Sequence, residues 1–203
     1  MKRIIALFLA CLLILSGCAS GPKPGLSEML GTQSDSIYRS AFGFSFDTVE
    51  MQVFSEEDLA VVNGADEFTP EALMALTDSG NAVTVFAAAP TSGASASLSL
   101  FPAAGLPGDI ETAADYAAYG LSVMPGKLET AGYTDVRMQQ ISVNLDDGEH
   151  PAVLCSAMIT EGVPYHLLQI CFQEGDWMGS LSLSSVESEE ALGALLARIS
   201  IND

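Results

Sequence analysis

The sequence is poor in positive charge. Its 203 residues include seven Lys and Arg against 26 Asp and Glu, a formal net charge of -19 at pH 7. Proteins that bind nucleic acid by neutralising phosphates need the opposite balance, so nucleic acid is excluded as the main partner. The same charge opposes adsorption to anionic lipid headgroups. At 49% hydrophobic residues the chain is nevertheless too apolar to be disordered, and its length suits one globular domain.

Cysteine and histidine are also scarce, at four Cys and two His. Four Cys are too few for a disulfide-dense secreted scaffold. His150 and His166 form neither a His-x-His nor a His-Glu-x-x-His spacing, so we expect no metal site. The acidic stretch from Asp146 to Glu149 lacks the alternating oxygen ligands of a calcium loop and fits a hairpin turn. The chain has neither a Gly-x-Ser-x-Gly elbow nor a phosphate-binding glycine loop, so we predict neither catalytic residues nor a cofactor.

The N-terminal residues have the pattern of an export signal. Lys2 and Arg3 precede an uncharged apolar run from Ile4 to Leu15. At about 1.5 Å per helical residue this run spans roughly 18 Å, well short of the roughly 30 Å hydrocarbon core of a bilayer. The pattern therefore predicts a cleaved signal and not a permanent membrane span.

The apolar run ends in Leu15-Ser16-Gly17-Cys18, which resembles the lipobox of bacterial lipoproteins. The resemblance implies a lipoprotein signal peptide over residues 1–17, cleavage before Cys18 and a diacylglyceryl thioether on its sulfur. Acyl chains such as palmitate would then hold the protein at the cell membrane, facing outside the cytoplasm. Two buried chains anchor stably without help from charge, so the anchor is compatible with the acidic domain. An ordinary secretory signal is the alternative.

The composition after Cys18 predicts two further segments. Residues 18–36 are rich in Gly, Pro, Ser and Thr, which is typical of a flexible tether, here a lipidated one. Residues 37–203 show no internal repeat and read as a single α+β extracytoplasmic domain.

Alternating apolar residues and turn signals predict strands, and apolar residues at helical spacing predict helices. Four consecutive strands are expected to form a C-terminal antiparallel meander: 136–145, 152–160, 165–173 and 177–184. Further strands are expected at 41–46, 82–89 and 95–101. Helices are expected over 70–76, 110–123 (capped by Asp109 and ended by Pro125) and 186–199. The order predicts a mainly antiparallel sheet covered by helices.

The meander should have one apolar and one polar face. If Phe172 opposes Trp177, side chains of the same parity share a face, because the side-chain period of a strand is two. The apolar face then holds Leu168, Ile170, Leu181 and Leu183, and the other face Gln169, Cys171, Gln173, Ser180 and Ser182. We expect the last helix to dock on the apolar face.

The order of elements resembles a known family. An entry strand ending in Gly43-Phe44-Ser45-Phe46, a hairpin before a middle helix, a meander with the Asp147-Gly148 turn and a last helix ending in Arg198-Ile199-Ser200-Ile201 are similar to PsbP-like domains of bacterial lipoproteins. The resemblance covers about residues 38–203 and implies an α/β/α sandwich. It also implies an accessory or binding protein and not a catalyst. It transfers no functional residue.

Cys155 and Cys171 are candidates for a disulfide. If the turn between their strands centres on Val163, the two cysteines oppose each other, with Cβ atoms about 4.5 to 5.5 Å apart. Such a bond can persist outside the cytoplasm. Two reduced, buried thiols are the alternative. A redox-active pair is disfavoured, because no Cys-x-x-Cys spacing or helix N-terminus lowers a thiol pKa.

These observations leave three hypotheses for function. The first is a lipid-anchored, non-catalytic domain that binds an envelope protein or a small ligand, to which the aromatic residues Tyr116, Tyr119, Tyr133 and Trp177 could contribute a groove. The second is an extracytoplasmic enzyme with a site assembled from scattered Asp, Ser and His. The third is a structural role in envelope assembly.

Overall fold

The computed structural model describes residues 25–89, 93–108, 110–159 and 162–202. Its helices are α2 (Leu26–Met29), α3 (Glu56–Asn63), α4 (Pro70–Asp78), α5 (Ala113–Thr130) and α6 (Glu190–Leu196), with a 3-10 turn η1 (Ala103–Gly105). Its strands are β1 (Thr32–Ser34), β2 (Ile37–Arg39), β3 (Phe44–Asp47), β4 (Gln52–Val53), β5 (Val83–Ala89), β6 (Ala94–Pro102), β7 (Thr134–Leu145), β8 (Gly148–Ile159), β9 (Val163–Glu174), β10 (Trp177–Ser185) and β11 (Ile199–Ile201). The α+β class predicted from the sequence is confirmed.

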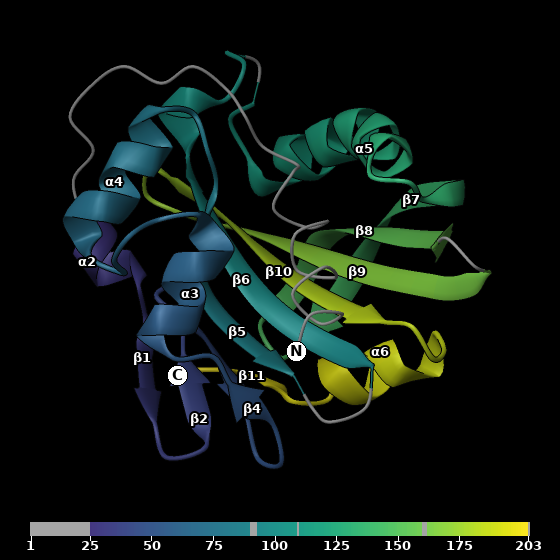
Figure 1. The fold of residues 1–203 in the computed structure, drawn as a ribbon, viewed down its shortest axis with the longest axis horizontal. Coiled ribbons are helices and arrows are strands. Elements are labelled where there is room, and N and C mark those ends of the chain that lie inside the picture. Colours follow the sequence, from purple (N-terminus) through teal and green to yellow (C-terminus); the bar gives the residue numbers. More distant parts are fainter. Residues whose placement is uncertain (1–24, 90–92, 109, 160–161, 203) are drawn as a thin grey trace.

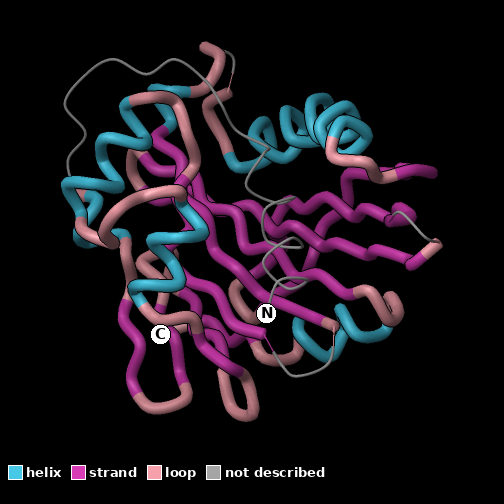
Figure 2. Tube along the Cα trace, viewed as in Figure 1, coloured by secondary structure: helices cyan, strands magenta, loops and turns pink. Residues whose placement is uncertain are grey.

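The strands form two antiparallel sheets. The larger has seven strands in the order β4-β5-β6-β10-β9-β8-β7, and the smaller has four in the order β1-β2-β3-β11. Strands β7 to β10 are successive neighbours, as expected for the meander. The helices lie outside the strands (Figure 2), with α5 at one end of the molecule and the small sheet toward the other (Figure 1).

The two faces of the meander have the predicted composition. Leu181 opposes Ile170, and Leu183 opposes Leu168. Phe172, however, opposes Gly179 and not Trp177, because the β9–β10 turn is shorter than assumed. This slip of two residues is one full side-chain period, so it leaves every side chain on its predicted face.

The apolar face of the large sheet packs against the small sheet, α2, α4 and α6. Phe44 and Phe46 alternate along β3 and are fully buried there, as is Leu73 of α4. Leu192 and Leu195 of α6 join the same cluster, as expected for the last helix. This helix is shorter than predicted, because β10 continues to Ser185 and Ile199 belongs to β11 instead.

Helix α5 covers the opposite face over β7, β8 and β9. It begins at a capping box in which Thr112 and Asp115 bond each other's backbone amides, whereas Asp109 lies outside the described residues. Pro125 does not end the helix, although a helix-interior proline costs about 3 kcal/mol. Met124 and Leu128 on either side are buried, and each contributes roughly 1.5 to 3 kcal/mol, which outweighs that cost.

Part of the expected tether is folded. Leu26 and Met29 of α2 are buried in the main core, and Tyr38 donates a hydrogen bond to the Leu30 carbonyl over 3.0 Å. Chain that packs in this way is not flexible, so the region available for a tether ends near residue 24. The sequence missed α2 because its apolar cluster is short. The signal segment 1–17 and Cys18 lie outside the described residues. Within the described residues, no helix is long and apolar enough to span a membrane.

Candidate functional site

The two cysteines of the predicted disulfide do not face each other. Cys155 opposes Leu167, four residues before Cys171 on β9. At about 3.3 Å per residue this offset is roughly 13 Å, whereas a disulfide needs Cα atoms within about 7 Å. The prediction was wrong because the hairpin turn lies earlier than assumed: Val163 is itself in β9, opposite Ile159. The two cysteines are buried and are not joined to each other.

The structure also argues against a redox role for Cys171. Burial raises the pKa of its thiol to about 12, so the reactive thiolate does not form near neutral pH. Tyr116 of α5 lies beside it, and burial raises the pKa of this phenol well above its ordinary value. Within the described residues the buried Tyr116 hydroxyl has no hydrogen-bond partner.

The other residues considered from the sequence have structural roles. His150 bonds Asp147 over 2.7 Å beside the β7–β8 turn, where Gly148 adopts a positive φ of 137°. No group of His, Cys, Asp and Glu among the described residues has the arrangement of a metal site. Tyr116, Tyr133 and Trp177 are buried in the core, and Tyr119 is half-buried.

A polar row crosses the meander at one end of its otherwise apolar face. The register places Arg137 of β7 opposite Ser156 of β8, Ser156 opposite His166 of β9, and His166 opposite Ser185 of β10. Directly opposed residues of antiparallel strands share a face, so these four side chains stand side by side. The next row inward contains Leu154, Leu168 and Leu183, which mark the start of the apolar core.

The turn between β10 and α6 brings acidic residues over this row. The Ser185 hydroxyl accepts hydrogen bonds from the backbone amides of Glu187 and Ser188, over 3.0 and 3.4 Å. These bonds hold the turn, after which Glu189 and Glu190 begin α6. The pKa of Glu190 is lowered by hydrogen bonds from its own amide and from Ser188, and further by the nearby His166.

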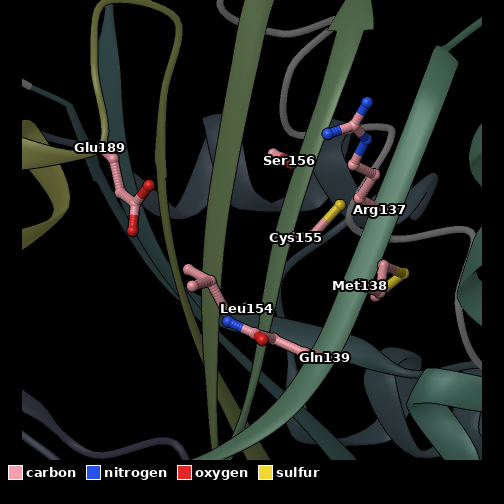
Figure 3. Close-up of a pocket in the computed structure, with 7 residues that line it drawn as sticks. All are labelled: Arg137, Met138, Gln139, Leu154, Cys155, Ser156 and Glu189. Carbon is pink, nitrogen blue, oxygen red and sulfur yellow. The ribbon is translucent and has the colours of Figure 1, made fainter.

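A hollow of about 270 Å³ lies between the polar row and the start of α6. Its lining includes Arg137, Gln139 and Ser156 on the sheet side and Glu189 on the helix side. Figure 3 shows the Arg137 and Glu189 side chains on opposite sides of the view, with Ser156 near the arginine. Both charged residues are exposed, and neither forms an ion pair within the described part of the chain.

The hollow combines several kinds of hydrogen-bonding group. Arg137 offers a planar fork of donors, which suits carboxylate or phosphate, and Ser156 and Gln139 can donate or accept. Glu189 supplies only acceptors when ionised. We therefore identify this hollow as the candidate binding site.

Sequence reasoning considered only one member of the polar row, His166, and interpreted it as a surface or half-buried residue. Arg137, Ser156 and Glu189 were missed, because they come from separate elements and each is an ordinary surface residue in its own segment. The only signal was the strand register: with the correct hairpin turns, Arg137, Ser156 and His166 fall in one row.

Likeness to known proteins is slight. No protein-family model and no curated protein matches the chain. Among solved structures, it is similar to the solution structure of cyanobacterial PsbP (CyanoP) from Synechocystis sp. PCC 6803, with 11% identity over 90% of this chain and 98% of that chain and a TM-score of 0.47. That protein bears the name of the family that the sequence resembles, but at this distance the likeness supports no argument about function.

Proposed function

We propose that this chain is a lipid-anchored, non-catalytic binding protein of the cell envelope, with its domain outside the cytoplasm. The observation that carries the proposal is the sequence Leu15-Ser16-Gly17-Cys18 after a basic start and an apolar run. Cleavage before Cys18 would remove Lys2 and Arg3 and change the side-chain charge from -19 to -21. Anionic headgroups repel such a body, so the acyl chains alone would hold it at the membrane.

The folded residues that follow Gly25 give the anchor a short reach. Only residues 18–24 would separate the lipid from α2, and a flexible chain of that length spans roughly 15 Å on average. The domain would thus remain close to the bilayer. In Figure 1, α2 lies at the left, whereas the β8 and β9 ends that carry the polar row lie toward the right. The candidate binding site would face away from the anchored end and be open to ligands from the aqueous side.

Metabolic labelling with a fatty-acid analogue tests the anchor. We expect wild-type protein to incorporate the label and Cys18→Ala to lose it. Cys11→Ala is the matched control, because Cys11 lies in the apolar part of the signal and should leave with it. Equal labelling of wild type and Cys18→Ala, or loss of label only in Cys11→Ala, would contradict the proposal.

Hydrolysis is the second candidate function, and one observation favours it: Ser156 directly opposes His166, which lies near Glu190. A serine, a histidine and a carboxylate are the components of a nucleophilic triad. No hydrogen bond joins Ser156 to His166 in the described structure, so binding is the better-supported function. Labelling with a fluorophosphonate separates the two: an enzyme would be labelled in wild type but not in Ser156→Ala, whereas a binding protein would be labelled in neither.

A further inference from the structure

The hollow presents two opposite charges that do not meet. Arg137 extends from β7 and Glu189 is the N-cap residue of α6, and both line the same hollow. An ion pair would bring their nitrogen and oxygen atoms within 4.0 Å, and none forms within the described residues. Both head groups therefore keep their hydrogen-bonding capacity for a third molecule.

The strand spacing separates the two ends of the polar row. Arg137 and Ser185 stand at the two ends of the polar row, separated by three neighbouring-strand intervals, or roughly 14 Å between Cα atoms. Glu189 follows shortly after Ser185. The charged groups of Arg137 and Glu189 lie more than 4.0 Å apart, because no ion pair joins them within the described residues.

The rest of the lining suits a small polar ligand. At about 270 Å³ the hollow is slightly below the range of pockets that hold drug-sized molecules. Ser156 and Gln139 lie beside Arg137 and can complete the hydrogen bonding of a carboxylate. Leu154 provides apolar contact within the same hollow.

Because the domain is acidic and has few cations, Arg137 indicates the charge of the ligand. The described residues contain only four Lys and Arg, namely Arg39, Lys127, Arg137 and Arg198. Arg198 donates to the carbonyls of Asp47 and Val49, whereas Arg137 has no hydrogen-bond partner in the described part. An acidic domain repels anions, and a cation such as Arg137 offsets this repulsion at the hollow. An ammonium group has the opposite requirement, which Glu189 meets.

We propose that the hollow binds a zwitterionic ligand of the amino-acid type, a free α-amino acid or a short peptide. Its carboxylate lies against Arg137 and Ser156, and its ammonium group lies against Glu189. The inference rests on the proposed binding function and adds the class of ligand. It does not depend on the lipid anchor, which is tested separately through Cys18.

Matched probes test whether both charges of the ligand are needed. Full-length protein in detergent is titrated with L-alanine and L-alanyl-L-alanine, and separately with propionate and ethylamine, each of which keeps one charged group. The thermal midpoint is followed at constant ionic strength. We expect saturable stabilisation by at least one zwitterion, with the single-charge probes at least about tenfold weaker.

Variants link the binding to the two residues. Arg137→Gln and Glu189→Gln should each lower the affinity for the zwitterion by about tenfold or more. The exposed controls Arg39→Gln and Glu187→Gln should change this affinity by less than about twofold. Non-specific stabilisation by an excluded solute would be equal in all five proteins and would not saturate. Circular dichroism of the unliganded variants checks their folding.

Three results would overturn the inference: no saturable effect of either zwitterion up to about 100 mM, propionate binding as tightly as L-alanine, or unchanged affinity in Glu189→Gln. Their consequences differ from a failure of the anchor. If the Cys18 label is absent but L-alanine binds, the ligand class stands and the membrane location falls; the reverse outcome removes the ligand class alone.

Discussion

The ring of Phe42 occupies the space that a side chain on Gly179 would need. Phe42 comes from the turn before β3, and Gly179 lies near the start of β10, so this contact joins the two sheets. The same phenylalanine packs against Phe172, with ring centroids 6.0 Å apart. Glycine at position 179 is thus required by the approach of the small sheet and not by its own backbone.

Gly179→Ala should therefore destabilise the protein. The new methyl group must displace the Phe42 ring, and overpacking of this kind costs about 1 to 3 kcal/mol. Urea unfolding followed by circular dichroism measures the loss. Gly126→Ala is the control, because nothing lies within 4 Å of its added Cβ and its helical position favours alanine. Equal stability of Gly179→Ala and wild type would show that the ring can move away at no cost.

Removal of the Tyr116 hydroxyl should leave stability unchanged or raise it. This oxygen is buried without a hydrogen-bond partner among the described residues, so Tyr116→Phe removes an unfavourable desolvation. We expect a gain of about 0 to 1 kcal/mol. The matched variant Tyr38→Phe should instead lose about 1 kcal/mol, since Tyr38 donates to the Leu30 carbonyl over 3.0 Å. Thermal melts of both proteins decide the prediction, and a clear loss in Tyr116→Phe would mean that its hydroxyl has a partner.

Asn63 should be important for holding α3 on the large sheet. Its amide group donates to the Thr84 carbonyl over 2.8 Å and accepts from the Thr84 amide over 2.7 Å. These bonds satisfy the backbone of β5 where its register with β6 shifts. Asn63→Ala leaves the carbonyl and the amide of Thr84 without these partners. The free energy of unfolding, measured with a chemical denaturant, should fall by about 2 to 3 kcal/mol. The exposed Asn81→Ala should change stability by less than about 0.5 kcal/mol, and a similar effect of both substitutions would contradict this role.

Stability should fall at alkaline pH, partly because of Cys171. Its pKa rises from an ordinary value of 9.0 to about 12 in the folded protein. Between these values the unfolded chain releases the thiol proton and the folded chain retains it, so the folded state binds more protons. The free energy of unfolding must then decrease as pH rises from about 9 to 12, whereas below pH 9 this contribution is fully present.

The comparison with Cys171→Ala removes the thiol proton together with the electrostatic effect of Cys171 on the neighbouring Tyr116. We expect the wild-type unfolding free energy to decrease more steeply above pH 9 by up to roughly 1.4 kcal/mol per pH unit. Parallel pH profiles would show that Cys171 titrates normally in the folded state.

A separate thiol titration should find two reactive groups in the unfolded mature domain without reductant.

Local patterns in the sequence were enough to predict most elements of the core. The Thr69-Pro70 start of α4, the alternation of Phe44 and Phe46, and the turn at Gly148 each depend on neighbouring residues alone. The faces of β9 and β10 were correct even with the wrong hairpin register, because a shift of two residues preserves parity. Helix α3 was missed, although Ser55 and Asp58 form the capping box that could have revealed it.

What tertiary structure alone decided is the meeting of distant residues. Pro125 stays within α5 because burial of the helix against the sheet outweighs the tendency of proline to end a helix, which is what the sequence alone predicted. The position of the β8–β9 turn separates Cys155 from Cys171 and sets Ser156 opposite His166, and the β7–β8 turn adds Arg137 to the same row. The sequence by itself determined the acidity and the strand periodicity, since these are properties of composition and of near neighbours. The hollow exists only because the β10–α6 turn folds Glu189 back over that row, and such a contact between remote segments depends on the packing of the whole domain.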